Sequence, residues 1–243
     1  MVILANIGIC LAFLVFGYLI GSIPTGVIIG KTFFHTDPRL YGSHGSGGTN
    51  SSRVLGKKVG VVVITLDILK TLMVFWICWA ILRYSGIKNL IALWDEGVFY
   101  LWLSLFGCSI GHCYPIYIGF KGGKAVACFM GSTGGTSWLM FALDFIVFFL
   151  VYKIGKRKNL VSFASIISSS ILLLVIWTCA ILNGCGFSTS ILMWDFGITQ
   201  SVWLGWEEAT VITSIFLLLL WRHHENIARL KSGTEKRYNL FGK

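Results

Sequence analysis

The sequence predicts an all-α polytopic membrane protein that forms one integral-membrane domain over residues 1–243. Of its 243 residues, 56% are hydrophobic and only 12% are charged, and the mean hydropathy is +0.78. A soluble domain usually carries about twice that charged fraction. Apolar runs of bilayer length recur along the chain, and basic residues are confined to alternate connections between them. The soluble, disordered and disulfide-stapled secreted classes are therefore excluded.

Five apolar runs are long enough to cross a bilayer, at 3–29, 59–82, 98–118, 160–182 and 202–221. The first run follows no basic segment and is too long for a signal peptide, so it is interpreted as a retained span. The stretch 125–152 is ambiguous because the sequence Gly131-Ser-Thr-Gly-Gly135 interrupts it. It predicts either one long broken span or two short crossings that turn at these glycines.

The distribution of charge favours the second arrangement. Segments 31–58, 119–124, 153–158 and 222–243 hold seventeen Lys and Arg against three acidic residues, whereas the other connections hold two against five. This asymmetry places the basic segments in the cytoplasm. Since an even number of crossings must separate 119–124 from 153–158, we expect seven transmembrane segments, two of them short, with the N-terminus outside and the C-terminus cytoplasmic. Five spans plus a re-entrant hairpin is the alternative.

The net charge of +10 thus serves orientation, and nucleic acid is not needed as a partner to explain it. The seven cysteines are odd in number, show no C-x-x-C spacing and lie mostly in apolar runs. They are interpreted as small packing residues, so neither a metal nor another cofactor is expected.

The first basic segment, 37–58, combines glycines with Ser, Thr, Asn and Arg side chains. Glycine lets backbone N–H groups point into a concavity that holds an anion, and the segment opens the second span, whose helix N-terminus would add its dipole. A flexible Gly/Ser tether is the alternative. The segment matches neither the Walker A motif nor G-x-G-x-x-G.

The second segment, 111–127, places Lys121-Gly122-Gly123-Lys124 just before another apolar helix. Basic groups, free glycine N–H groups and a helix start are typical of phosphate binding, whereas a basic membrane-flanking turn explains the lysines alone. His112 in this segment is interpreted as a hydrogen-bonded packing residue in preference to a base.

The third segment begins at Arg222, and if the last span's helix continues inward, His223, Asn226 and Ile227 share one face. A basic stop-transfer tail is the alternative. Together the three segments indicate a phosphorylated, anionic substrate at the inner interface, beside a space for an acyl chain. Because no Ser-His-Asp order or metal-ligand cluster is visible, transfer from an already activated donor is favoured.

Five motifs, taken together, closely resemble those of the bacterial acyl-phosphate:glycerol-3-phosphate acyltransferases, the PlsY family. They are G-S-I-P-T-G at 21–26, the D-x-R-x-x-G-S loop from Asp37 to Gly56, Asp67 with Lys70, the G-H-x-Y-P…F-K-G-G-K stretch at 111–127, and H-x-E-N-I-x-R-L at the start of 223–235. The resemblance covers the whole chain. Gly45 stands where the family has Asn, Ala125 replaces a Gly, and 183–205 is longer than the family norm.

The resemblance implies transfer of a fatty acyl group from acyl phosphate to the sn-1 hydroxyl of glycerol 3-phosphate. The products are 1-acyl-glycerol 3-phosphate (lysophosphatidic acid) and inorganic phosphate, in the first step of phospholipid biosynthesis. It also implies a multi-pass protein of the bacterial cell membrane with its active site at the cytoplasmic face, in contact with membrane lipid.

The resemblance also assigns roles to residues. Arg53, Lys57 and the 121–124 loop are expected to hold phosphate, and His223 is either a general base or a positioner; the resemblance favours the positioner, with a phosphate oxygen of the donor taking the proton. Ser43, Asn50 and Asn226 are expected to donate to the glycerol backbone and the oxyanion. In full, the catalytic candidates are Ser43, Arg53, His223 and Asn226; the substrate-binding candidates are Thr49, Asn50, Lys57, Lys121, Gly122, Gly123 and Lys124; and the structural candidates near the site are Glu235 and His112.

The competing class is a membrane transporter of an organic phosphate. The broken stretch 125–152 and the charged residues Asp67, Lys70 and Asp144 inside spans are transporter-like. Against it, the informative motifs gather at one face and no inverted repeat is apparent. A structural membrane protein whose basic tail binds anionic lipid is a third hypothesis.

Overall fold

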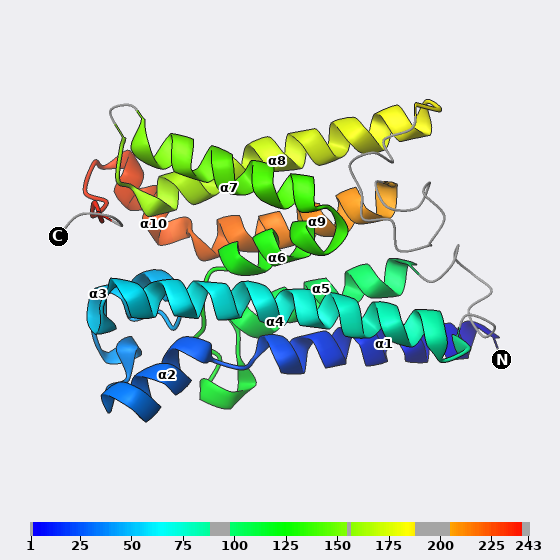
Figure 1. Cartoon of the computed structure of the whole chain (residues 1–243), viewed down its shortest axis with the longest axis horizontal. Helices are drawn as coiled ribbons and strands as arrows, with labels where there is room; N and C mark the ends of the chain where they lie inside the picture. The colour runs from blue at the N-terminus through cyan, green and yellow to red at the C-terminus, as the bar shows by residue number, and fades with distance from the viewer. Residues whose placement is uncertain (1, 88–97, 155–156, 188–204, 240–243) are drawn as a thin grey trace.

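The computed structural model describes residues 2–87, 98–154, 157–187 and 205–239, and every regular element within them is a helix. Most helices run back and forth along the long axis of the molecule, while α2, α3 and α10 lie at one end of it (Figure 1). The elements are α1 (Val2–Gly21), α2 (Thr25–Phe34), η1 (Pro38–Leu40), α3 (Gly48–Leu55), α4 (Lys57–Tyr84), α5 (Val98–Cys113), η4 (Ile116–Ile118), α6 (Val126–Thr136), α7 (Trp138–Lys153), α8 (Val161–Gly184), α9 (Trp206–Arg222) and α10 (His224–Lys231).

Four segments of the described residues are long and apolar enough to cross a membrane: Ile3–Phe34, Lys57–Tyr84, Phe99–Ile118 and Val161–Gly184. The all-helical membrane class is thereby confirmed. Helices α6, α7 and α9 have 11, 16 and 17 residues. At 1.5 Å per residue they extend from about 16 to about 26 Å, less than the roughly 30 Å of a hydrocarbon core.

The first apolar run is not one helix over 3–29. Helix α1 ends at Gly21 and α2 begins at Thr25, with Pro24 as its N-cap residue. Proline has no N–H to continue the helical ladder and disfavours helical geometry in the residue before it, so the chain bends here. The bend sets α2 apart from α1 at the end of the molecule that carries α3 and α10 (Figure 1).

The stretch 125–152 forms two helices, but they do not turn at Gly131–Gly135 as predicted. These glycines lie inside α6, and the break comes at Ser137, whose hydroxyl accepts a hydrogen bond from the backbone N–H of Met140 at 3.2 Å. A side chain at Gly131 would lie 2.7 Å from Thr71 Cβ, and one at Gly135 would lie 2.7 Å from Phe75 Cγ. The glycines therefore permit close packing of α6 on α4.

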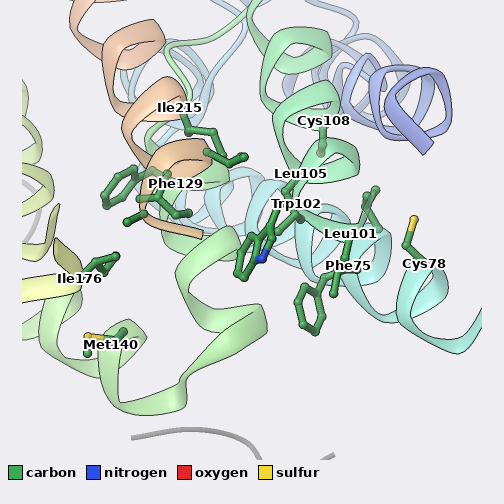
Figure 2. Close-up of a cluster of buried hydrophobic side chains, with 14 of the residues drawn as sticks. Phe75, Cys78, Leu101, Trp102, Leu105, Cys108, Phe129, Met140, Ile176 and Ile215 are labelled. Carbon is green, nitrogen blue, oxygen red and sulfur yellow. The ribbon is translucent and has the colours of Figure 1, made fainter. Parts of the chain in front are cut away.

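A continuous apolar core joins these helices. Figure 2 shows Trp102 and Leu101 of α5 beside Phe75 of α4, while Phe129 of α6 faces Ile215 of α9. All five side chains are completely buried. Close packing of these side chains fixes the positions of α4, α5, α6 and α9 relative to one another.

Helices α1 and α5 approach so closely that their backbones touch. Added side chains at Gly17 and Gly21 would lie 1.9 and 2.0 Å from the carbonyl oxygens of Ser104 and Cys108. The contact is reciprocal, because side chains at Gly107 and Gly111 would lie 2.2 and 2.1 Å from carbonyl oxygens of α1. Each helix thus presents a G-x-x-x-G pair, the small-residue packing typical of membrane helices.

We expect Gly17→Val to destabilise the protein by about 1–3 kcal/mol, because backbone atoms of Ser104 occupy the space that the new side chain needs. The thermal unfolding midpoint in detergent measures this. Gly8→Val is the matched control in the same helix, since nothing lies within 4 Å of a side chain there. Equal midpoints for the two variants would contradict the close contact.

Candidate active site

Asn50 organises the first basic segment through its side-chain amide. Its Oδ1 accepts hydrogen bonds from the backbone N–H of Ser43 at 2.7 Å and from Ser43 Oγ at 3.1 Å. Its Nδ2 donates to the carbonyl oxygens of Pro38, Tyr41 and Gly45 at 2.7, 3.2 and 2.9 Å. Asn50 is 3% exposed. The structure therefore uses this amide to close the loop, and Ser43 stands at its exposed rim.

The segment does not lead directly into the second span. It forms its own short helix, α3, with Gly47 at the N-cap, and α4 begins only after Gly56, whose φ of 102° favours glycine. Helix α3 carries Thr49 and Arg53. Ahead of it, Arg39 lowers the pKa of Asp37 to about 2 and donates from Nη1 to the carbonyl of Ile118 at 2.8 Å, tying the first segment to the second.

Backbone hydrogen bonds hold the 121–124 loop against the end of α5. The N–H groups of Gly122 and Gly123 donate to the carbonyls of Cys113 and His112 at 3.2 and 2.9 Å. The prediction that these two N–H groups are free for an anion is therefore wrong. Arg222 completes the loop from outside, donating from Nε to the Gly123 carbonyl at 3.0 Å and from Nη2 to the Gly122 carbonyl at 3.3 Å.

The first loop, the 121–124 loop and the His112 ring meet at Gly123. A methyl group on it would lie 2.1 Å from Nε2 of His112. A methyl group on Gly47, at the start of α3, would lie 3.8 Å from the Cα of Gly123. Only a residue without a side chain fits between the His112 ring and the first loop, so the two glycine-rich segments contact each other here.

His112 belongs to a buried polar network, as its interpretation as a packing residue requires. Lys70 donates to His112 Nδ1 at 3.2 Å and forms an ion pair with Asp67 at 2.7 Å. Asp67 also accepts from Thr25 Oγ1 at 2.7 Å, and Lys70 donates to the Ile23 carbonyl at 3.0 Å. The network joins the break after α1 to α4 and α5 and orients the ring behind Gly123.

Asn226 connects the third segment to the second. Lys124 Nζ donates to Asn226 Oδ1 at 2.5 Å, and Asn226 Nδ2 donates to Glu235 Oε1 at 2.7 Å and to Ser162 Oγ at 2.9 Å. Glu235 also pairs with Arg229 at 2.7 Å. Burial opposes the charge of Glu235, yet the hydrogen bonds from Ser162, Arg229 and Asn226 lower its pKa. Glu235 thus holds Asn226 in place, in keeping with the structural role expected of it.

Lys124 lies in a strongly positive neighbourhood. Its burial lowers the pKa to about 8; Glu235 acts in the opposite direction, while the charges of Arg229 and Arg53 reinforce the lowering. The guanidinium of Arg53 makes no hydrogen bond or ion pair with any described residue. Two cations are therefore held near each other with their charge only partly compensated, an arrangement that attracts a dianion.

His223 lies at the break between α9 and α10, so the predicted continuous helix is wrong at this one residue. It is 3% exposed, and Nδ1 bonds the Leu219 carbonyl at 2.8 Å. Burial, reinforced by the charge of Lys124, lowers its pKa to about 4. The ring is therefore neutral near pH 7, with its proton on Nδ1 and its lone pair on Nε2.

The structure brings together Arg53, Lys124, His223, Asn226 and Glu235. The side chains of Thr49, Lys57 and Lys121 make no hydrogen bond or ion pair with another described residue. Sequence reasoning missed Arg222, which was counted only as the start of a basic tail. The described residues contain no group of His, Cys, Asp and Glu able to hold a metal ion.

The glycerol-3-phosphate acyltransferase family matches residues 11–233 of the chain. The chain belongs to this family. Among the acyltransferase's relatives, the glycerol-3-phosphate acyltransferase of Mycoplasma mycoides is 35% identical, with 94% of this chain and 92% of that protein covered. The Staphylococcus haemolyticus protein of the same name is 37% identical, with 91% and 94% covered.

A solved structure of PlsY (YgiH), an integral membrane glycerol 3-phosphate acyltransferase in its glycerol 3-phosphate form, is 31% identical to this acyltransferase. The alignment has a TM-score of 0.71 and covers 96% of this chain and 99% of that one. The lysophosphatidic acid form of PlsY gives a TM-score of 0.68 at 30% identity. Membership of an enzyme family decides against the transporter hypothesis, and Asp67 and Lys70 neutralise each other in a buried ion pair.

We expect Gly123→Ala to lower acyltransferase activity by about 100-fold, because the methyl group displaces either the loop or the His112 ring, and displacements near 1 Å carry costs of this order. Initial rates of the purified variant measure this. Gly45→Ala is the control, since its methyl group meets nothing within 4 Å. Full activity of Gly123→Ala would show that the contact with His112 does not matter.

Proposed function

We propose that this chain transfers a fatty acyl group from acyl phosphate to the sn-1 hydroxyl of glycerol 3-phosphate, releasing 1-acyl-glycerol 3-phosphate and inorganic phosphate. The reaction is the first step of phospholipid biosynthesis. The observation that carries this proposal is the pair of incompletely compensated cations, Arg53 and Lys124, beside the neutral imidazole of His223. The glycerol 3-phosphate and lysophosphatidic acid forms of the related PlsY support the choice of acceptor and product.

The cations bind the phosphate of glycerol 3-phosphate. The Arg53 guanidinium, which has no hydrogen-bonding partner among the described residues, offers its N–H groups to phosphate oxygens in a bidentate manner. Lys124 adds a point charge, and its hydrogen bond to Asn226 sets the direction of its ammonium group. Charge neutralisation by fixed groups of this kind stabilises the transition state without reorganisation.

The neutral ring of His223 accepts the hydrogen bond of the attacking hydroxyl at Nε2. A pKa of about 4 makes this ring a weak base at the pH of the cytoplasm, since efficient general bases titrate near the working pH. As the hydroxyl oxygen attacks the acyl carbon, its proton passes from the hydrogen bond with Nε2 to an oxygen of the departing phosphate, and the bond from the acyl carbon to that phosphate breaks. Acyl phosphate is a mixed anhydride, so no covalent enzyme intermediate is needed.

An apolar groove of about 460 Å³ adjoins the cleft that contains Asp67, Lys70 and His112, and in this proposal it accommodates the acyl chain. It runs along α2 to η4, lined chiefly by Ile23, Val27, Ile28, Tyr117 and Ile118. Ile23 and Pro24 also border the cleft that contains Ser46, Lys70 and His112, so the groove leads toward the first loop.

The proposed orientation is seven crossings with the N-terminus outside and the active site at the cytoplasmic face of the bacterial membrane. Helices α1 and α4 to α9 run along one axis, and the basic segments share one end of it, which supports this orientation (Figure 1). Exposed aromatic side chains lie at both ends, Tyr84 and Trp206 at one and Tyr117 and Trp221 at the other, as in the aromatic belts of membrane proteins.

The proposal is tested with the purified protein in a lipid mesophase supplied with palmitoyl phosphate. We expect inorganic phosphate to be released only when glycerol 3-phosphate is present, with one lysophosphatidic acid formed per phosphate. Release that is independent of glycerol 3-phosphate would overturn the acceptor assignment. Uptake of glycerol 3-phosphate into sealed vesicles without any product would favour the transporter.

The role of His223 is tested with two variants. We expect His223→Gln to keep turnover within about tenfold, because its amide oxygen also accepts the hydroxyl's hydrogen bond, whereas His223→Ala loses about 100-fold or more. Single-turnover rates with palmitoyl phosphate measure this. Equal losses in the two variants would show that His223 is the obligatory base.

The lowered pKa of Lys124 predicts a limit to activity at alkaline pH. Lys124 is charged below about pH 8 and neutral above it, so the KM for glycerol 3-phosphate rises as the pH passes through 8. Lys124→Arg stays charged throughout, and its rise in KM is expected at a clearly higher pH. The pH profiles of kcat/KM measure this, and identical alkaline limbs for the two proteins would contradict it.

A further inference from the structure

The C-terminal segment after α10 returns to the site through Tyr238. The Tyr238 hydroxyl lies 2.6 Å from Ser52 Oγ and also donates to the Ser52 carbonyl at 3.3 Å. Its backbone N–H donates to the Asn159 carbonyl at 2.8 Å, and its own carbonyl accepts from the Tyr152 hydroxyl at 2.6 Å. The ring is thus fixed between α3, the end of α7 and the connection that follows α7.

The fixed ring lies against Arg53. The guanidinium carbon of Arg53 is 5.4 Å from the centre of the Tyr238 ring, within the range of a cation–π contact. The guanidinium makes no hydrogen bond or ion pair with any described residue, so among these residues the aromatic face is the contact that holds the charged group. A carboxylate partner would hold the group equally well, but it would occupy the N–H donors and cancel the charge.

We propose that Tyr238 is the positioning residue of Arg53: its ring holds the guanidinium by one face and leaves the N–H edge free for the substrate's phosphate. This inference rests on the proposed function, in which Arg53 binds glycerol 3-phosphate. It gives the C-terminal segment a role in substrate affinity, because hydrogen bonds of its backbone with Tyr152 and Asn159 anchor the ring that holds Arg53.

Two substitutions separate the ring from the hydroxyl. Tyr238→Leu removes the aromatic face, and we expect the KM for glycerol 3-phosphate to rise about tenfold while kcat changes less than threefold. Tyr238→Phe keeps the face and loses only the bonds to Ser52, and we expect its KM within threefold of the unsubstituted protein. Tyr84→Leu, at an exposed tyrosine at the far end of the molecule, is the matched control.

A double-mutant cycle distinguishes positioning from general destabilisation. In an Arg53→Ala background, Tyr238→Leu is expected to change the dissociation constant of glycerol 3-phosphate less than twofold, since the group it positions is gone. Calorimetric titration of the full chain in detergent measures this. An undiminished tenfold effect in that background, or an unchanged KM in Tyr238→Leu, would overturn the proposal.

The outcomes also separate this inference from the proposed function. Should the unsubstituted protein bind glycerol 3-phosphate but release no phosphate from palmitoyl phosphate, the proposed reaction fails while the binding cycle still decides the role of Tyr238. Should Tyr238→Leu not fold, Tyr152→Phe replaces it, because it removes the bond to the Tyr238 carbonyl and keeps the aromatic ring at 152. A rise of about threefold in its dissociation constant supports the proposal, and an unchanged constant overturns it.

Discussion

The backbone contact between α1 and α5 is the constraint on which the site depends. Four glycines let the C-terminal halves of the two helices touch, so α1 ends beside Cys108 and the bend at Pro24 falls next to the end of α5. His112 follows Gly111 directly, and its carbonyl and that of Cys113 carry the N–H groups of the 121–124 loop. The position of Lys124 is therefore set by packing between α1 and α5.

At the site, the acidic residues pair with groups other than Arg53 and Lys124. Glu235 serves Asn226 and Arg229, and Asp37 serves Arg39, so each acid near the loops is already engaged. Arg53 is held by an aromatic face and Lys124 by a neutral amide. In the proposed reaction the remaining positive charge binds the substrate's phosphate, so part of the basicity from which the orientation is inferred would also serve catalysis.

Much of this could be predicted from the sequence, because hydropathy and charge report directly on which segments lie in lipid and at which end. The turn at Gly131–Gly135 was misplaced because glycine both permits turns and permits close packing, and hydropathy does not distinguish the two. The sequence predicts that the side-chain amide of Asn50 and the N–H groups of Gly122 and Gly123 donate hydrogen bonds to substrate. A pattern of polar residues does not reveal that these donors bind nearby backbone carbonyls instead. No sequence pattern indicates a role for Tyr238, because its proposed role depends on contacts with Ser52 and Tyr152, which are distant in the chain.

The proposed reaction requires phosphate to bind at Arg53 and Lys124 at the basic end of the helices. A crystal structure of the protein with glycerol 3-phosphate tests this requirement. We expect the phosphate within hydrogen-bonding distance of both the Arg53 guanidinium and Lys124 Nζ, with the sn-1 hydroxyl at Nε2 of His223. A glycerol 3-phosphate bound away from both cations would contradict it.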